Sequence, residues 1–254
     1  MTGEAVILGS GTSNGVPMLG WEYPPGYLDN PKNHRTRASI ALLGPTGNLL
    51  VDCSPELRIQ VTREKLYRFE KVLITHTHAD HVMGMDDLRS LSILERKAVE
   101  IVTLPQHQED IRRIFPYAFA DFPPEIEVPR FKLVDMEPEL QVGGLTLQMF
   151  VVPHGKTPVI AFRVNDFAYL TDVSSIPDDV APYLENLETL VIDAVRLKPH
   201  PNHLNFEQAQ EVARRFKPKT TYFTHLSHDY DHDVTEAMLP PNVRLAYDGL
   251  RIPF

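Results

Sequence analysis

An apolar run at residues 72–74 leads straight into a His-x-His-x-Asp-His motif at residues 76–81, and this segment constrains the chain more than any other. In an extended strand, side chains two residues apart point to the same side, so His76 and His78 can reach one metal ion together. A turn after His78 then changes the direction in which the side chains of Asp80 and His81 point. Imidazole and carboxylate ligands suit zinc, manganese or iron, whereas calcium and magnesium prefer oxygen ligands. The segment therefore predicts half of a two-metal site.

Composition limits the kind of protein that carries this motif. With 254 residues and 43% hydrophobic content the chain can bury a full core, and we expect one domain over residues 1–254. The chain shows no secretion-signal pattern, no apolar run long enough to span a membrane, and one cysteine, Cys53. These features predict a soluble, cytoplasmic protein without membrane contact.

The formal net charge of −9 argues against broad nucleic-acid binding, without excluding it. A small anionic substrate remains compatible with this charge, because two bound divalent cations would dominate the local field inside a pocket.

Strand and helix patterns alternate along the chain and predict a mixed α/β fold. Strand patterns cover residues 5–8, 39–43, 49–52, 71–75, 100–104, 131–134, 145–152, 159–164, 168–170, 189–193, 220–224 and 243–246. Helical patterns cover residues 55–66, 83–97, 106–115, 178–184 and 206–216. Two strand-rich halves, before and after about residue 125, each have helices to cover one sheet face.

Two long loops, residues 10–36 and 116–129, carry aromatic side chains. Loops of this length within a compact domain are usually functional or disordered. The aromatic residues of the first loop, Trp21, Tyr23 and Tyr27, either line a pocket or pack over the sheet as a lid. The second loop is either a substrate rim or a contact patch of a homodimer.

A two-metal site needs more than four ligands, and three further residues fit. His154, Asp172 and His225 each follow an apolar run where it meets a loop, the usual place for site residues on a rigid scaffold. Taken singly, each is more often a hydrogen-bonded polar residue. Together with the motif at residues 76–81 they complete a ligand set.

This arrangement resembles the metallo-β-lactamase superfamily over almost the whole chain. The resemblance implies a four-layer αββα sandwich and two divalent transition-metal ions, with zinc, manganese and iron all admissible. It further implies that one metal is held by His76, His78 and His154, the other by Asp80, His81 and His225, and that Asp172 and a hydroxide bridge both.

Within the superfamily, the chain is most similar to the cyclic phosphodiesterases of phosphonate degradation, the phosphoribosyl cyclic phosphate phosphodiesterases. The segments that carry this similarity are residues 9–17, 75–89, 202–203 and 224–228. The similarity implies hydrolysis of a small cyclic or nucleotide-like phosphodiester by the metal-bridging hydroxide. Asp80 would hold the hydroxide as well as its metal, and His203 would protonate the leaving alkoxide.

Some of these relatives bind an additional zinc through cysteines in the first loop and a histidine like His228. This chain has Trp21, Glu22 and Tyr23 in that loop, which argues against the extra zinc. We expect His228 to form hydrogen bonds instead.

Other polar residues are expected in supporting or surface positions. Metal-bound histidines usually donate their other ring N–H to an acceptor, and Asp52 and Asp193 are the expected acceptors. His34 and His107 are expected to be exposed, and His200 is expected on the surface. The basic residues Arg35, Arg37, Arg89, Arg196 and Lys198 either meet a substrate phosphate or lie on solvated faces or in structural ion pairs.

Rival functions stay open. An RNA endonuclease that processes tRNA 3′ ends belongs to the same superfamily, but the acidic balance and the lack of a long basic insertion argue against it. A lactone or thioester hydrolase keeps the metals and changes the bond, and only the pocket distinguishes that case. β-Lactam hydrolysis, redox chemistry at two irons and an inactive binding protein are disfavoured, because the chain shows no secretion signal, no glutamate substitution in the motif and no missing ligand.

Overall fold

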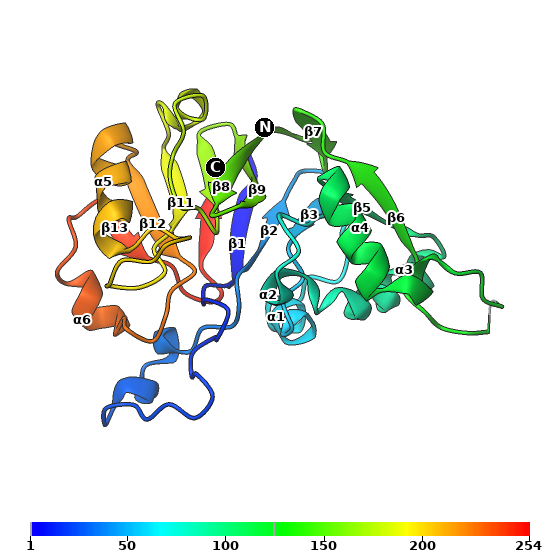
Figure 1. Cartoon of the computed structure of the whole chain (residues 1–254), viewed down its shortest axis with the longest axis horizontal. Coiled ribbons are helices and arrows are strands. Elements are labelled where there is room, and N and C mark those ends of the chain that lie inside the picture. Colours follow the sequence, from blue (N-terminus) through cyan, green and yellow to red (C-terminus); the bar gives the residue numbers. More distant parts are fainter. Residues whose placement is uncertain (1, 124) are drawn as a thin grey trace.

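The computed structural model describes residues 2–123 and 125–254, whose strands form two seven-stranded sheets (Figure 1). The first sheet has the order β14-β1-β2-β3-β4-β5-β6, and the second has the order β13-β12-β11-β10-β9-β8-β7. The strands are β1 (Glu4–Gly9), β2 (Ser39–Leu43), β3 (Asn48–Val51), β4 (Lys71–Leu73), β5 (Val99–Thr103), β6 (Phe131–Asp135), β7 (Glu139–Val142), β8 (Leu145–His154), β9 (Thr157–Val164), β10 (Phe167–Leu170), β11 (Thr189–Asp193), β12 (Thr220–Thr224), β13 (Val243–Leu245) and β14 (Arg251–Pro253).

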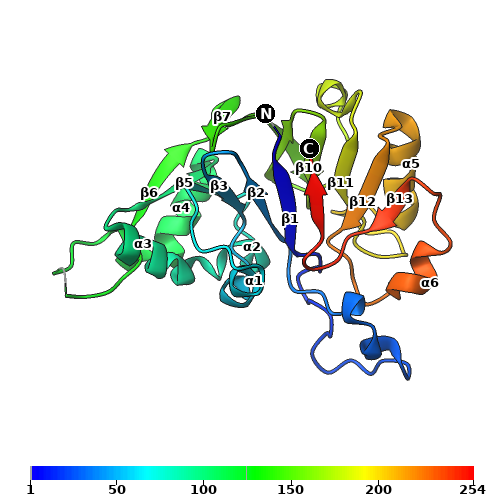
Figure 2. The same ribbon diagram turned by 180° about the vertical axis from the view of Figure 1, so that it is seen from behind.

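Helices cover the outer faces of the two sheets (Figure 2). They are α1 (Leu57–Glu64), α2 (Ala79–Val82), α3 (Arg89–Glu95), α4 (Pro105–Ile114), α5 (Phe206–Phe216) and α6 (His232–Glu236). Short 3₁₀ turns lie at Tyr27–Asp29, Pro31–Asn33, Met85–Leu88, Pro116–Phe119 and Ala181–Leu184. Within the described residues, every helix is too short or too polar to cross a membrane.

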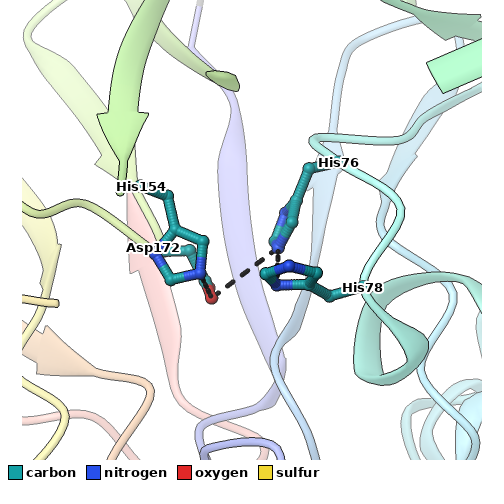
Figure 3. Close-up of side chains that lie close together, drawn as sticks. All are labelled: His76, His78, His154 and Asp172. Atoms are coloured by element: carbon teal, nitrogen blue, oxygen red, sulfur yellow. Dashed lines mark hydrogen bonds and ion pairs between the residues drawn. The ribbon is translucent and has the colours of Figure 1, made fainter. Parts of the chain in front are cut away.

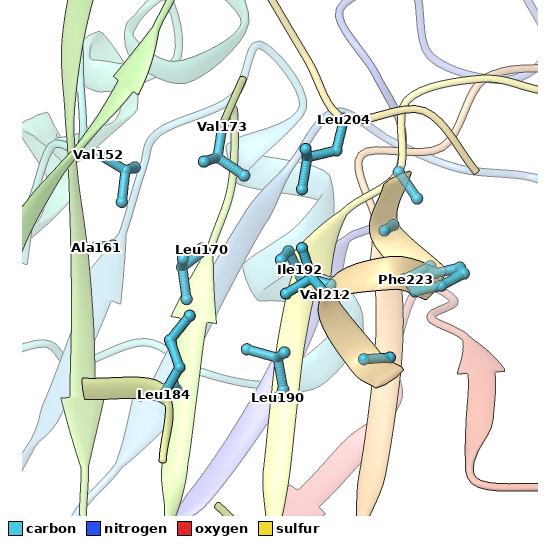
Figure 4. Packing of buried hydrophobic residues seen from close by; sticks show 14 of the residues in the cluster. Val152, Ala161, Leu170, Val173, Leu184, Leu190, Ile192, Leu204, Val212 and Phe223 are labelled. Atoms are coloured by element: carbon cyan, nitrogen blue, oxygen red, sulfur yellow. The ribbon is translucent and has the colours of Figure 1, made fainter. Parts of the chain in front are cut away.

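Three hydrophobic clusters separate the four layers and confirm the predicted αββα sandwich. On β1, Ala5 and Ile7 belong to the cluster between the sheets, whereas Val6 and Leu8 belong to the cluster under the helices of the first sheet. The third cluster lies on the outer face of the second sheet, where Val212 of α5 packs with residues of β11 and β12 (Figure 4). Because both faces of these strands are buried, they read as continuous apolar runs.

The predicted elements are largely confirmed, with corrections where tertiary contacts decide. The patterns at residues 39–43, 189–193, 206–216 and 220–224 match their elements residue for residue. The pattern at residues 83–97 is divided between a 3₁₀ turn and α3, and that at residues 178–184 forms only a 3₁₀ turn. Strands β7 and β14 were not predicted, because they are short, alternate with exposed residues and are held by pairing with β8 and β1.

Parallel pairing brings the carboxyl ends of the central strands to one edge of each sheet. Strands β3 to β6 are parallel in the first sheet, and β10 to β13 are parallel in the second. β8 is antiparallel to β9, which is antiparallel to β10, so β8 runs in the same direction as β10. Residues that follow these strands can therefore converge, as ligands do at such edges in open α/β sheets.

Candidate metal centre

The residues predicted as metal ligands lie together at the carboxyl ends of strands from both sheets. His76, His78 and His154, with Asp172, point toward one another in Figure 3. One potential ligand atom from each of these four residues lies within 4.8 Å of the others. The Nε2 atom of His76 lies 2.9 Å from Nδ1 of His78, and Nε2 of both His76 and His154 lies 3.8 Å from Oδ2 of Asp172. His78 is exposed, whereas the other three side chains are buried.

A second group of possible ligands consists of Asp80, His81 and His225, whose ligand atoms also lie within 4.8 Å of one another. The Nε2 atom of His81 lies 3.3 Å from Oδ2 of Asp80 and 3.3 Å from Oδ1 of Asp172. The Nε2 atom of His225 lies 3.4 Å from the same two carboxylate oxygens. Asp172 therefore directs one carboxylate oxygen to each group.

The chemistry of these atoms fits divalent metal ions. The Nε2 atom of His81 is buried and has no hydrogen-bond partner, although it points at the carboxylates of Asp80 and Asp172. A buried imidazole nitrogen without a partner is costly, and coordination of a cation relieves that cost. Imidazole and carboxylate together are typical ligands of zinc and other first-row transition metals.

Hydrogen bonds from outside the two groups fix the orientation of two of the imidazole rings. Asp52 Oδ2 lies 2.7 Å from Nδ1 of His81, and the backbone carbonyl of Asn202 lies 2.7 Å from Nδ1 of His154. Because a carboxylate or carbonyl oxygen only accepts, Nδ1 donates in both cases and Nε2 is left for a metal. The expected role of Asp52 agrees with this geometry, and Asn202 is an acceptor that sequence reasoning missed.

Charge is distributed unevenly across the centre. Burial lowers the pKa of the His225 imidazole, but the carboxylates of Asp172, Asp80 and Asp193 raise it more, to about 9. The pKa of His81 is raised in the same way, since Asp172, Asp52 and Asp80 outweigh its burial. The second group therefore favours positive charge, which protons supply without metal and a divalent cation supplies when it binds.

In the first group the pKa values of the histidines are lowered and not raised. Burial, together with the neighbouring His81, lowers the pKa of His76 well below its ordinary value. Burial also lowers the pKa of His78 and of His154. These three imidazoles are therefore neutral near pH 7, as metal ligands must be.

The backbone takes an unusual conformation at residues of the centre. Asp52, Asp172 and His225 have φ angles of 62°, 50° and 59°, in the left-handed region. Asp and His enter this region more readily than most residues, but it still costs energy. The sharp turn after each strand is what aims these three side chains into the centre.

His203 lies beside the first group but was not predicted to be a ligand. It is buried, its Nδ1 lies 2.8 Å from Oδ2 of Asp193, and its Nε2 lies 3.9 Å from Oδ2 of Asp172. The expected acceptor role of Asp193 thus applies to His203. His200 is half-buried, with its ring centre 4.7 Å from that of His203.

The expectation that His107 is exposed was wrong. His107 is buried, since Nε2 of its ring lies 2.9 Å from the carbonyl oxygen of Pro158 on the other half of the molecule. For Arg35, a phosphate contact, a solvated face and a structural ion pair were all open. The residue is buried, and its guanidinium donates to the side chains of Tyr27 and Asn33, which removes the solvated face from these alternatives. His34 is exposed, as expected.

The aromatic side chains of the first loop pack against the segment that follows His225. The ring of Trp21 lies 4.3 Å, centre to centre, from that of His228, and Tyr23 stacks on Tyr27 at 4.9 Å. The hydroxyl of Tyr27 donates to the carbonyl of Tyr230. The ring of His228 therefore packs against an aromatic side chain of this loop.

In the second loop, Pro124 lies outside the described residues, and Phe119 packs on Phe131.

Comparison with known proteins assigns most of the chain to the superfamily that its sequence motifs resemble. The family model described as "Beta-lactamase superfamily domain" matches residues 47–226. A curated relative, an octanoyltransferase of Porphyromonas gingivalis (strain ATCC BAA-308 / W83), is 32% identical over 252 residues, which are 97% of this chain and 51% of the relative. The chain therefore spans about half the length of that relative.

Two solved structures share the fold over almost their whole length. One, described as a new diphosphatase from the PhnP family, is 33% identical with a TM-score of 0.92, and the match covers 100% of this chain and 98% of that one. The other, zinc-bound PqqB from Methylobacterium extorquens, is 20% identical with a TM-score of 0.77, and the match covers 98% and 99%. The second likeness concerns the fold alone.

Proposed function

We propose that this chain, which belongs to the β-lactamase superfamily and is a metal-dependent hydrolase, uses two metal ions to cleave phosphodiester bonds. The proposed substrate is a small cyclic or nucleotide-like molecule. The family relationship and the similarity to a PhnP-family diphosphatase support hydrolysis of a phosphorus–oxygen bond. The bond, the substrate and the number of metal ions belong to the proposal.

The observation that carries the proposal is the position of Asp172 between two groups of ligands. Its Oδ2 faces His76 and His154, and its Oδ1 faces His81 and His225. His76, His78 and His154 would hold one metal ion, and Asp80, His81 and His225 would hold the other, with Asp172 shared. Two ions held in this way would suit an in-line displacement at phosphorus, because they would supply charge stabilisation to the attacking and the leaving oxygen together.

When bound, divalent ions lower the pKa of water and neutralise charge on phosphoryl oxygens. The side chains of the protein supply orientation and proton transfer. Asp80, a buried member of the second group, would orient the attacking water as well as bind metal. His203, held by Asp193, would donate a proton to the leaving alkoxide.

A second candidate is hydrolysis of a medium-chain acyl ester or thioester. It is favoured by the relative named as an octanoyltransferase, which the chain matches at 32% identity. Because the match covers only 51% of that relative, the acyl chemistry can belong to its unmatched half. The phosphodiester therefore remains the first proposal.

We also propose zinc or manganese as the native metals, with iron as the third choice, and a cytoplasmic protein that can form homodimers. Elemental analysis of the purified protein tests the metals, and we expect two ions per chain. Light scattering tests the oligomeric state.

The deciding experiment measures hydrolysis of bis(p-nitrophenyl) phosphate by protein that has been stripped of metal and reloaded with Mn²⁺ or Zn²⁺. We expect metal-dependent turnover that Asp172→Ala abolishes together with metal binding. The control Asp178→Ala removes an exposed carboxylate and should retain both. Hydrolysis of p-nitrophenyl octanoate without diester hydrolysis would favour the second candidate, and hydrolysis of neither by metal-loaded protein would overturn both.

A further inference from the structure

A hollow of about 460 Å³ opens beside His78, between α4 and the turn that joins β8 to β9. His78 is the exposed member of the first ligand group, and it lines this hollow. A substrate bound at the candidate centre therefore has open space next to it on this side. The hollow is also lined by Thr77, Asp110, Arg113 and Lys156.

Contacts among side chains fix one wall of the hollow. Thr77, between two candidate ligands, donates its hydroxyl to Oδ2 of Asp110 on α4 at 2.9 Å. The ring of His107, one helical turn earlier, contacts the carbonyl oxygen of Pro158 on β9 at 2.9 Å. Helix α4 is thus tied both to the motif that carries His78 and to the opposite sheet. Groups on this wall therefore keep a set position relative to the candidate centre.

The charged groups that line the hollow favour an anion. Lys156 has no ion pair within the described part of the chain, and it is exposed at the β8–β9 turn. Arg113 is 76% exposed, and its only carboxylate neighbour among the described residues is Asp110, at 3.6 Å. Asp110 is the one carboxylate in the lining, and it is already engaged by Thr77 and Arg113. Two cations against one engaged carboxylate leave a local positive excess on a chain of net charge −9.

We propose that this hollow is a subsite for a phosphate group that the substrate carries apart from the bond to be cleaved, with Lys156 and Arg113 as specificity-determining residues. The inference rests on the proposed phosphodiesterase function and narrows its substrate class. Arg binds phosphate through a fork of N–H donors, and Lys acts as a mobile point charge. Both side chains are long enough to adjust to a ligand that enters from solvent.

The test uses a matched pair of substrates with the same scissile bond. Thymidine 5′-(p-nitrophenyl phosphate) lacks a second phosphate, and its 3′-phosphorylated form carries one. For the unmodified protein we expect kcat/KM to be at least about tenfold higher for the phosphorylated substrate, since two charge-assisted contacts are gained. Lys156→Gln and Arg113→Gln should each lower this ratio about threefold, and the double variant should bring it near one.

Lys97→Gln is the control, because Lys97 is an exposed lysine outside this lining and should leave the ratio unchanged. A second readout is calorimetric binding of thymidine 3′,5′-bisphosphate compared with thymidine 5′-monophosphate. The bisphosphate should bind more tightly, and the double variant should remove the difference. A ratio near one in the unmodified protein, or a preference that survives in the double variant, overturns the subsite.

If the protein is not a phosphodiesterase, the result differs from that of a missing subsite, because metal-loaded protein then hydrolyses neither substrate. The calorimetric comparison still decides the subsite, because it needs binding and not turnover.

Discussion

The Nδ1 atom of His203 lies 2.8 Å from Oδ2 of Asp193, and both side chains are buried. Because the carboxylate only accepts, Nδ1 donates, and Nε2 is the ring nitrogen that faces the candidate centre, 3.9 Å from Asp172. This geometry suits the proposed role of His203 as a proton donor beside the candidate metal ligands.

The first prediction follows from this arrangement. An alkoxide leaving group needs a proton, whereas p-nitrophenolate leaves readily without one. His203→Ala should therefore lower kcat about 100-fold for a 2′,3′-cyclic nucleotide and much less for bis(p-nitrophenyl) phosphate, with metal content unchanged. His34→Ala, at an exposed histidine, should change neither rate. Equal losses on both substrates would argue against the proton-donor role.

The second prediction concerns pH and metal removal. In the unfolded chain His225 has a pKa of about 6.5, whereas in the folded, metal-free protein it is raised to about 9. A raised folded pKa stabilises the fold fully below pH 6.5, and this stability is lost as pH rises toward 9. Metal-free protein should therefore melt at lower temperatures as pH rises from 6.5 to 8.5.

Metal-loaded protein should show a much smaller change, because a metal ion replaces the proton. The measurement is a series of thermal melts with EDTA or with Zn²⁺. It ends at pH 8.5 because burial also raises the pKa of the Cys53 thiol, which would contribute at higher pH. The decline should be smaller in metal-free His225→Gln. A metal-free melting temperature that is constant or rises over this range would contradict the assignment.

Much of the candidate centre could be predicted because its residues follow strands. The spacing of His76 and His78 comes from the two-residue period of an extended chain, and His154, Asp172 and His225 each stand where an apolar run ends. The structure brings these residues together because parallel strands of both sheets end at one edge. Their roles as ligands stay predictions.

Features that depend on distant partners could not be predicted. His107 looks like a surface residue in its helix, and its burial comes from the carbonyl of Pro158, 51 residues away. The acceptor for His154 is the backbone carbonyl of Asn202, and because every residue has such a carbonyl, the residue type does not reveal this contact. Strand β14 is three residues long and exists because β1 offers it an edge.

The third prediction uses two glycines with similar backbone conformations. Gly155 follows His154 and has φ +60°, and a Cβ there would lie 2.6 Å from Oδ1 of Asn202. Gly20 has φ +74° with no atom within 4 Å of such a Cβ. Both Ala variants should lose about 1–2 kcal/mol of stability from the left-handed backbone.

Only Gly155→Ala should also disturb the candidate centre. The added Cβ meets the side chain of Asn202, and we expect the resulting shift of this residue to move its backbone carbonyl, which accepts from His154 Nδ1. We expect about tenfold weaker metal binding at the first group, by the usual effect of losing such a partner. Chelator competition measures this affinity, and differential scanning calorimetry measures stability. If the two variants have equal metal affinity, the close approach at Gly155 does not position His154.

The fourth prediction concerns Asp52, which has no candidate metal contact but holds His81. Oδ2 of Asp52 lies 2.7 Å from Nδ1 of His81, and Oδ1 accepts from the backbone N–H of Thr75 at 2.8 Å. Asp52→Asn keeps the shape and tolerates the left-handed backbone at φ 62°. An amide presents fewer acceptors, so one of these contacts is lost or the His81 tautomer changes, which would place a proton on Nε2.

The affinity for one of the two proposed metal ions should therefore fall about 10–100-fold, while the other, which the proposal assigns to His76, His78 and His154, should bind as before. Titration of metal-free protein with Zn²⁺ against a chelator should resolve one tight and one weakened site in this variant and two tight sites in the unmodified protein. Asp178→Asn, at an exposed carboxylate, is the matched control and should keep both sites tight. Two unaffected sites in Asp52→Asn would mean that packing alone orients His81, and equal weakening of both would mean that Asp52 supports the whole edge of the sheet through Thr75.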